Sequence, residues 1–169
     1  MSGRITRYDT MFMYEVLLGL LFNTHLLRLP MTGWIVLILI GLTFEIVTAS
    51  SWTYSNEFRD SLFTIRGTDI SIAAAFSWAA VLVICMSLGL SLASRIAIPA
   101  APTLFTILAV GLVGNALETL CWRWGMFVYN STWVTRMIVF KRPLFVWGVP
   151  LSVRLGYFLI FGPICAVCV

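Results

Sequence analysis

Three ionisable side chains lie inside long apolar stretches of this sequence. Glu45 and Glu118 each stand near the end of such a stretch, and Arg154 lies within the run "FVWGVPLSVRLGYFLIFG" from Phe145 to Gly162. A charged group in the middle of a bilayer costs at least about 2.5–3.5 kcal/mol, and such groups are therefore rare and commonly functional. We expect these side chains to face inward and to compensate one another.

The positions of these groups indicate one common depth. Glu45 and Glu118 lie roughly 5–10 Å inside the membrane at about 1.5 Å per residue, and both approach the same surface. Arg154 lies about ten residues into its segment, near 15 Å, but its long stem reaches back toward that surface. Asp69 is expected to begin a helix there, where a carboxylate favours the helix N-terminus. Glu15 enters from the same side. The sequence predicts that Arg154 pairs with Glu118 or Glu45.

This combination suits acid chemistry on a hydrocarbon. A carboxyl group that has no cationic partner in an apolar pocket can act as a general acid. Aromatic ring faces can stabilise a carbocation. The predicted catalytic residues are Glu118, Glu45, Arg154 and Asp69, and the predicted substrate-binding residues are Trp52, Tyr54, Trp122, Trp124, Tyr129, Trp147 and Tyr157. The alternatives are a structural ion pair that fixes helix register and an ordinary interfacial belt of aromatic residues.

Composition sets the fold class. The chain has 169 residues, of which 60% are hydrophobic and only 11% charged. These values are far from those of soluble domains, so the sequence predicts an all-α, polytopic transmembrane helical bundle. Residues 1–169 form one transmembrane domain with about five spans, expected at 12–29, 32–50, 71–93, 101–122 and 144–168.

Basic residues predict the orientation of these spans. Eight Lys and Arg residues fall on the side that holds the N-terminus, and only Arg28 and Arg95 fall on the other. This asymmetry predicts a cytoplasmic N-terminus and a C-terminus on the opposite side. The net charge of +4 therefore reflects topology and not nucleic-acid binding. No pattern in the sequence indicates a metal site or a cofactor.

A weak internal repeat relates two predicted helix pairs. The second span ends "FEIVTASSWTYS" and the fourth ends "LETLCWRWGMFVYN", each with a Glu ahead of Trp and Tyr. After the connection that follows each of these spans, a second pair of similar segments occurs, "DISIAAAF" in the first half and "PLSVRLGY" in the second. Since both pairs run in the same direction, the sequence predicts a parallel repeat.

These motifs resemble the membrane-integral carotenoid biosynthesis proteins of the bacterioruberin and carotenoid 1,2-hydratase type. The family's Y-x-G-[VI]-P-L-S-N-F-x-G-W segment is matched here by Gly148, Val149, Pro150, Leu151, Ser152, Gly156 and Tyr157. Val153 stands in place of Asn, and Arg154 in place of an aromatic residue. Glu45 matches the earlier acidic position of the family, and Glu118 stands where the family more often has Asp-Pro. The resemblance implies an isoprenoid substrate and acid-catalysed hydration or cyclisation of a terminal double bond.

Other function classes remain open. The chain can instead be a non-enzymatic integral subunit of a larger photosynthetic or respiratory membrane complex, because it is small and ends in the apolar segment "ICAVCV". A proton- or solute-conducting unit is disfavoured, because the acidic residues gather on one side and do not form a relay across the bilayer. The expected partners are a membrane lipid or isoprenoid substrate, or other membrane subunits.

Overall fold

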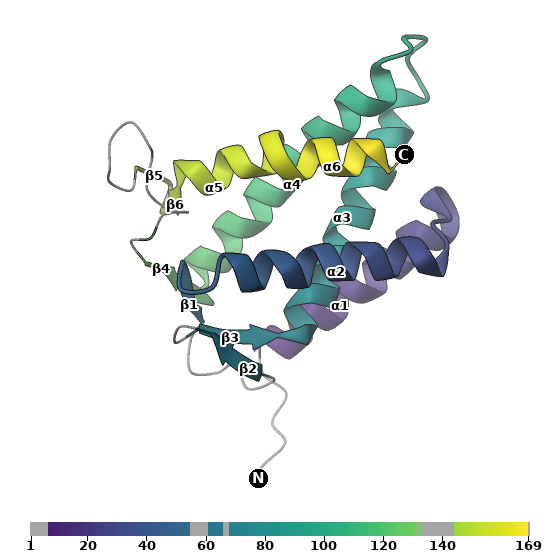
Figure 1. Cartoon of the computed structure of the whole chain (residues 1–169). Helices are drawn as coiled ribbons and strands as arrows, with labels where there is room; N and C mark the ends of the chain where they lie inside the picture. The colour runs from purple at the N-terminus through teal and green to yellow at the C-terminus, as the bar shows by residue number, and fades with distance from the viewer. Residues whose placement is uncertain (1–6, 55–60, 66–67, 131, 133–143, 169) are drawn as a thin grey trace.

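The computed structural model describes residues 7–54, 61–65, 68–130, 132 and 144–168, and most of them are helical (Figure 1). A π-helical turn, Asn23–Leu27, extends the first helix, and a second one, Tyr157–Phe161, joins the last two helices. The helices are α1 (Arg7–Phe22), α2 (Met31–Val47), α3 (Ile72–Ala93), α4 (Ala101–Arg123), α5 (Leu151–Gly156) and α6 (Gly162–Val167).

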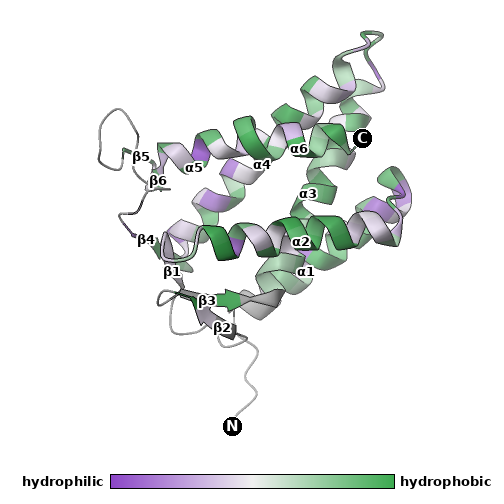
Figure 2. Ribbon diagram, viewed as in Figure 1, coloured by the Kyte–Doolittle hydropathy of each residue, from purple (hydrophilic) through white to green (hydrophobic). Residues whose placement is uncertain are grey.

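Three of these helical segments are long and apolar enough to cross a membrane: Thr10–Leu27, Ala73–Ala93 and Ala101–Arg123. Met31–Val47 and Leu151–Val167 are apolar but shorter. Each has 17 residues, and at 1.5 Å per residue they reach roughly 26 Å, slightly less than a typical hydrocarbon core. The predicted helical, membrane-compatible character is confirmed at this level, and Figure 2 shows hydrophobic residues along all of these helices.

The last helix begins later than the sequence predicted. Residues 145–150 form a small hairpin, in which β5 (Phe145–Val146) pairs with β6 (Val149–Pro150). Trp147 and Gly148 form its two-residue turn with φ values of 48° and 79°. Such turns need positive φ at both central positions, a conformation that glycine adopts readily. The predicted span 144–168 therefore divides into a hairpin and a helix that starts at Leu151.

Further short strands gather at the same end of the molecule (Figure 1). β1 (Trp52–Tyr54) pairs with β4 (Phe127–Tyr129), and β2 (Ser61–Ile65) pairs with β3 (Thr68–Ser71), both antiparallel. Asp69 lies in β3 opposite Thr64, and α3 begins only at Ile72. The prediction that Asp69 begins a helix is therefore wrong, because the chain arrives at α3 through a hairpin.

The chain uses the same order of elements twice. A helix, a strand, a hairpin and a second helix occur as α2, β1, β2–β3 and α3, and again as α4, β4, β5–β6 and the helix from Leu151. Strands β1 and β4 occupy equivalent places and pair with each other. Their register centres on Thr53 and Val128, with Trp52 opposite Tyr129 and Tyr54 opposite Phe127. This register is two-fold symmetric.

A glycine lies four residues before the glutamate in both halves, at Gly41 and Gly114. A Cβ atom at Gly41 would lie 3.1 Å from the Cβ of Trp78 on α3. A Cβ atom at Gly114 would lie 2.3 Å from the Tyr157 ring, on the helix that corresponds to α3. The absence of a side chain thus lets each glutamate-bearing helix approach the next helix closely.

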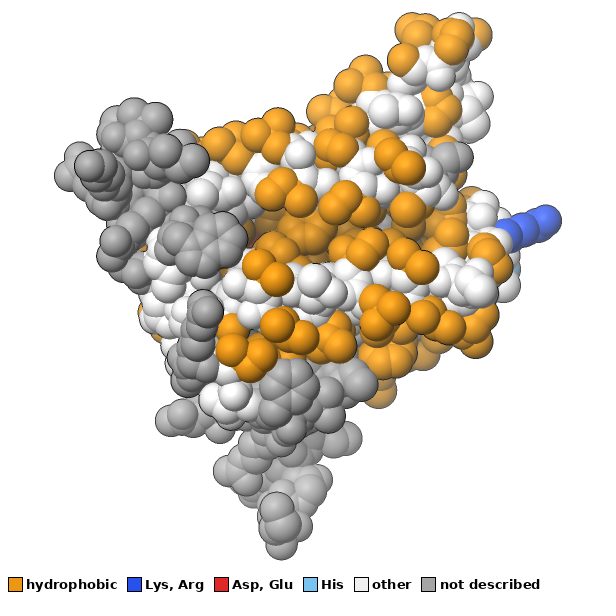
Figure 3. Space-filling model, viewed as in Figure 1, with side chains coloured by type: hydrophobic (Ala, Val, Ile, Leu, Met, Phe, Trp, Pro, Cys, Tyr) orange, Lys and Arg blue, Asp and Glu red, His pale blue; other side chains and the backbone are white. Residues whose placement is uncertain are grey.

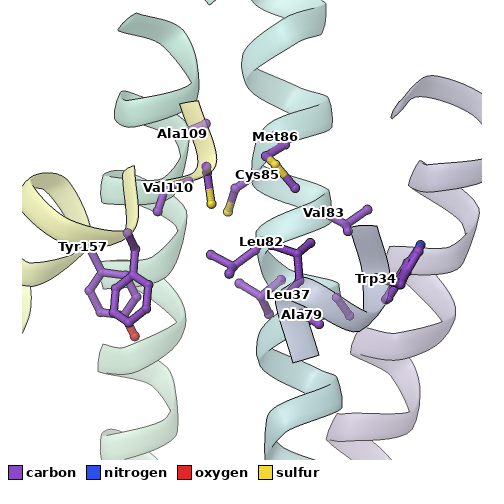
Figure 4. Packing of buried hydrophobic residues seen from close by; sticks show 14 residues of the cluster. Trp34, Leu37, Ala79, Leu82, Val83, Cys85, Met86, Ala109, Val110 and Tyr157 are labelled. Carbon is purple, nitrogen blue, oxygen red and sulfur yellow. The ribbon is translucent and has the colours of Figure 1, made fainter. Parts of the chain in front are cut away.

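Helix α3 lies at the centre of the bundle and packs on α1, α2 and α4. Of its membrane-length segment, 67% is buried, against 11% in the first helix and 22% in α4. Figure 4 shows its side chains Ala79, Leu82, Val83, Cys85 and Met86 directed at neighbouring helices. The first helix and α4 therefore present much of their apolar surface to the surroundings.

Candidate functional site

A cavity of about 140 Å³ opens between the helices at the end that carries the strands. Its walls are mostly apolar, but three carboxylates line it: Glu15 from α1, Glu45 from α2 and Glu118 from α4. Figure 3 shows a hollow with an apolar floor between α2 and the helix from Leu151 to Val167. The volume is close to that of an engineered cavity of about 150 Å³ that holds benzene. The cavity therefore has room for one end of a lipid.

Glu118 accepts hydrogen bonds on both carboxylate oxygens. Tyr157 donates its phenolic proton to Oε2 over 2.6 Å, and Tyr129 donates to Oε1. Burial and the adjacent Glu118 raise the pKa of the Tyr129 phenol, so this group remains a proton donor. Both tyrosines were predicted to bind substrate from the sequence, and the structure brings them to a predicted catalytic glutamate.

The other two carboxylates approach the cavity from different walls. Ser77 on α3 donates a hydrogen bond to Oε2 of Glu15. Glu45 is only 1% exposed and follows Phe44, whose ring also lines the cavity. Glu15 stands outside the predicted catalytic set, although its place in the first apolar segment is visible in the sequence.

Arg154 has other partners than the sequence predicted. It is the fourth residue of α5, in the first turn, so it does not lie ten residues deep in a helix. Its guanidinium donates to the backbone oxygen of Val146 at 2.8 and 2.9 Å, to Oδ1 of Asn115 at 3.2 Å and to Oγ1 of Thr119 at 2.9 Å. These acceptors are neutral, so the hydrogen bonds of Arg154 go to groups other than Glu118 and Glu45, the predicted partners, although Arg154 still lies near enough to Glu118 to interact with it electrostatically.

The arrangement around Arg154 gives this side chain a positioning role. Nδ2 of Asn115 donates back to the backbone oxygen of Arg154 over 3.1 Å, and the Trp147 ring lies 5.5 Å from the guanidinium carbon. The guanidinium is thus bound by three oxygen acceptors and lies near the face of an aromatic ring. Arg154 fastens the β5–β6 hairpin to α4 and fixes the start of α5.

Aromatic rings form much of the cavity wall. Trp78 stacks on Tyr157 and Phe161 at centroid distances of 5.6 and 5.5 Å. Phe44 contacts Phe161 at 4.7 Å and the predicted substrate-binding residue Trp52 at 5.7 Å. Phe44, Trp78 and Phe161 were missed from the sequence, because each lies inside an apolar helix where an aromatic residue usually only packs.

The remaining predicted residues lie elsewhere. Trp124 and Trp147 are 59% and 80% exposed, and Trp122 packs over the turn at Gly148. These three tryptophans are not among the described residues that line the cavity. Tyr54 pairs with Phe127 through the backbone, and the side chains of Tyr54 and Asp69 fall outside the described part of the structure.

Within the described ranges, no group of three or more His, Cys, Asp or Glu side chains is arranged to hold a metal ion. Comparison of the chain with protein-family models, with curated proteins and with solved structures finds no match.

Proposed function

We propose that this chain is a five-span membrane protein that binds the end of an isoprenoid-like lipid in its acidic cavity. The observation that carries this proposal is the convergence of three carboxylates and several aromatic rings on one small apolar space. A hydrocarbon terminus suits the apolar walls, and the carboxylates supply reactivity that a purely structural core does not need.

The chemistry that fits is acid-initiated addition to a terminal trisubstituted double bond. Glu118 or Glu45 gives a proton to the less substituted carbon, which leaves a tertiary cation near the ring faces. In hydration, water adds to this cation and its extra proton returns to a carboxylate. In cyclisation, a second double bond of the chain attacks this cation and forms a ring with a new cation, and a carbon next to the new cation gives a proton back to a carboxylate. Either sequence restores the acid.

The proposed topology follows from charge and strand pairing together. The eight-to-two distribution of basic residues favours a cytoplasmic N-terminus. Strands β1 and β4 follow α2 and α4 directly, and their pairing holds the C-terminal ends of both helices together. Ends that meet in this way are expected on the same membrane surface. The cavity then lies toward the cytoplasmic half.

The described surface favours lipid contact over a tight seam with another protein. Interfaces between membrane helices are enriched in small residues. Large aliphatic side chains are instead exposed along several helices, among them Leu17, Leu18, Leu21, Ile35, Leu39, Leu104, Leu112, Leu159 and Ile160. A subunit role in a larger complex is the competing proposal.

Purification in a mild detergent, followed by mass spectrometry of bound proteins and extracted small molecules, tests the proposal. We expect an isoprenoid lipid and no stoichiometric partner chain. A fixed set of partner chains without such a lipid would favour the complex-subunit role. The Glu118→Gln variant, purified in parallel, checks whether any lipid depends on the cavity.

A further inference from the structure

The cavity reaches the outer surface of the bundle at one of its walls. Among the described residues that line the cavity, Ile160 alone is exposed, at 55%. Ile160 lies in the last helix, Leu151–Val167, next to the outward-facing Leu159. The other described lining residues are buried or half-buried. The cavity therefore connects with the lipid-facing surface beside the last helix.

This opening lies between two helices that belong to different pairs. Helix α2 packs on α3, whereas the last helix packs on α4. Figure 3 shows the hollow between α2 and the last helix, with hydrophobic side chains on both sides of it. Phe44 of α2 contacts Phe161 of the last helix at a centroid distance of 4.7 Å, and both rings line the cavity. An aromatic contact thus joins the two helices next to the opening at Ile160.

Gly156 leaves open space beside this opening. It precedes Ile160 by four residues, about one helical turn, and it also lines the cavity. A Cβ atom at Gly156 would meet no atom within 4 Å, whereas one at Gly114 would lie 2.3 Å from the Tyr157 ring. Helix packing therefore does not require a glycine at position 156. The π-helical turn Tyr157–Phe161 begins directly after it, and such turns are frequent at functional sites.

The depth of the opening indicates what can enter it. Ile160 comes nine residues after Leu151, the first residue of α5, which corresponds to about 14 Å at 1.5 Å per residue. In the proposed topology, this depth is close to the middle of a hydrocarbon core of about 30 Å. Lipid headgroups lie outside that core, so the surroundings of the opening are hydrocarbon chains. The ligand that fits the opening is therefore the free end of such a chain.

We infer that an isoprenoid hydrocarbon enters the cavity sideways from the bilayer, through the opening at Ile160, and that Gly156 provides the width its chain needs. This inference rests on the proposed function and adds the entry route and the residues that select the ligand. The free end of the chain points to the glutamates. The rest of the chain lies between α2 and the last helix, in contact with the lipid.

Two adjacent residues provide a matched pair of variants. Ile160→Trp and Leu159→Trp enlarge exposed aliphatic side chains of the last helix, but only Ile160 lines the cavity. Binding is measured in lipid nanodiscs with a tritiated linear isoprenoid hydrocarbon, as the fraction that an excess of the unlabelled hydrocarbon displaces. We expect Ile160→Trp to weaken this binding about ten-fold and Leu159→Trp to leave it unchanged. Gly156→Leu should weaken it similarly without lowering the melting temperature, because leucine favours the helix over glycine.

A photoreactive form of the same hydrocarbon, with one diazirine in the middle of its chain, maps the route. After photolysis in nanodiscs, we expect displaceable label on the last helix near Ile160 and on α2 near Phe44. Equal binding to the Ile160→Trp and Leu159→Trp variants, or displaceable label only at Met126 and Phe127 beside the strands, overturns the inference and leaves the proposed function intact. Absence of displaceable binding to wild-type protein overturns both.

Discussion

Tyr157 donates its phenolic proton to Oε2 of Glu118 over 2.6 Å, between residues 39 positions apart in the sequence. The contact joins α4 to the last helix beside the cavity, and the Tyr157 ring also stacks on Trp78. One side chain thus connects the acid to the aromatic wall.

Removal of the phenol oxygen separates these two functions of Tyr157. Tyr157→Phe keeps the stacked ring and loses the hydrogen bond to Glu118, which should lower the free energy of unfolding by about 1.5–3 kcal/mol. Tyr129→Phe should act similarly. Since the two phenols bond the two oxygens of one carboxylate, the effects of the two substitutions should be coupled, and the double variant should not show their sum. Thermal unfolding in detergent measures this coupling, and strict additivity would contradict it.

Glu118→Gln tests the chemistry. The amide keeps the shape of the side chain but offers one acceptor oxygen in place of two, and it supplies no proton of comparable acidity. We expect loss of product from an isoprenoid substrate, with a folded protein that elutes normally in size-exclusion chromatography. Retained turnover in this variant would exclude Glu118 as the proton donor and direct attention to Glu45.

Two glycines give a matched test of close packing. A Cβ atom at Gly114 would lie 2.3 Å from the Tyr157 ring, whereas one at Gly156 meets nothing within 4 Å. Gly114→Ala should therefore displace Tyr157, weaken ligand binding and lower the melting temperature. Gly156→Ala should be tolerated or mildly stabilising, because alanine favours the helix by about 1 kcal/mol. Equal melting temperatures for the two variants would contradict the described contact.

At position 154, arginine and lysine should differ in how well they stabilise the fold. Lysine retains the charge but cannot bond the Val146 backbone, Asn115 and Thr119 with one planar fork. Arg154→Lys should therefore lower the melting temperature, and Arg154→Met should lower it further by leaving three acceptors without a donor. If lysine restored full stability, charge alone and not geometry would explain the residue.

The native cysteines report on topology. Cys168 is exposed near the C-terminus, whereas Cys85 and Cys165 are buried. A membrane-impermeant thiol reagent should label Cys168 from the non-cytoplasmic side of intact cells, and Cys168→Ser should abolish that labelling. If Cys168 reacted only after the membrane was permeabilised, the C-terminus would be cytoplasmic and the proposed orientation would be wrong.

Hydrophobic runs predicted the helical segments well where the pattern is simple. The predicted segments 71–93 and 101–122 differ by one residue at one end from the helices Ile72–Ala93 and Ala101–Arg123. Their length and their polar boundaries determine these limits. The echo around Glu45 and Glu118 also indicated two related halves, and the structure repeats the same order of elements in them.

Short-range conformation explains what the sequence did not predict. The hairpin 145–150 is mostly apolar, like the helix that follows it, so an apolar run alone cannot separate the two. The positive φ of Trp147 and Gly148 decides this boundary. Once the helix starts at Leu151, Arg154 moves to the first turn and meets Val146, Asn115 and Thr119. The contacts of Phe44 and Trp78 with distant residues follow from the packing of helices against one another, which the spacing of residues along the sequence does not predict.

The pairing of β1 with β4 has a consequence for biogenesis. Strand β1 is synthesised early, but its partner β4 is synthesised only after α3 and α4, so the backbone groups of β1 remain unpaired with β4 until then. Because the register is two-fold symmetric about Thr53 and Val128, a strand from a second nascent chain fits the same edge. Domain-swapped dimers are therefore the expected off-pathway product when synthesis is fast and chains are crowded.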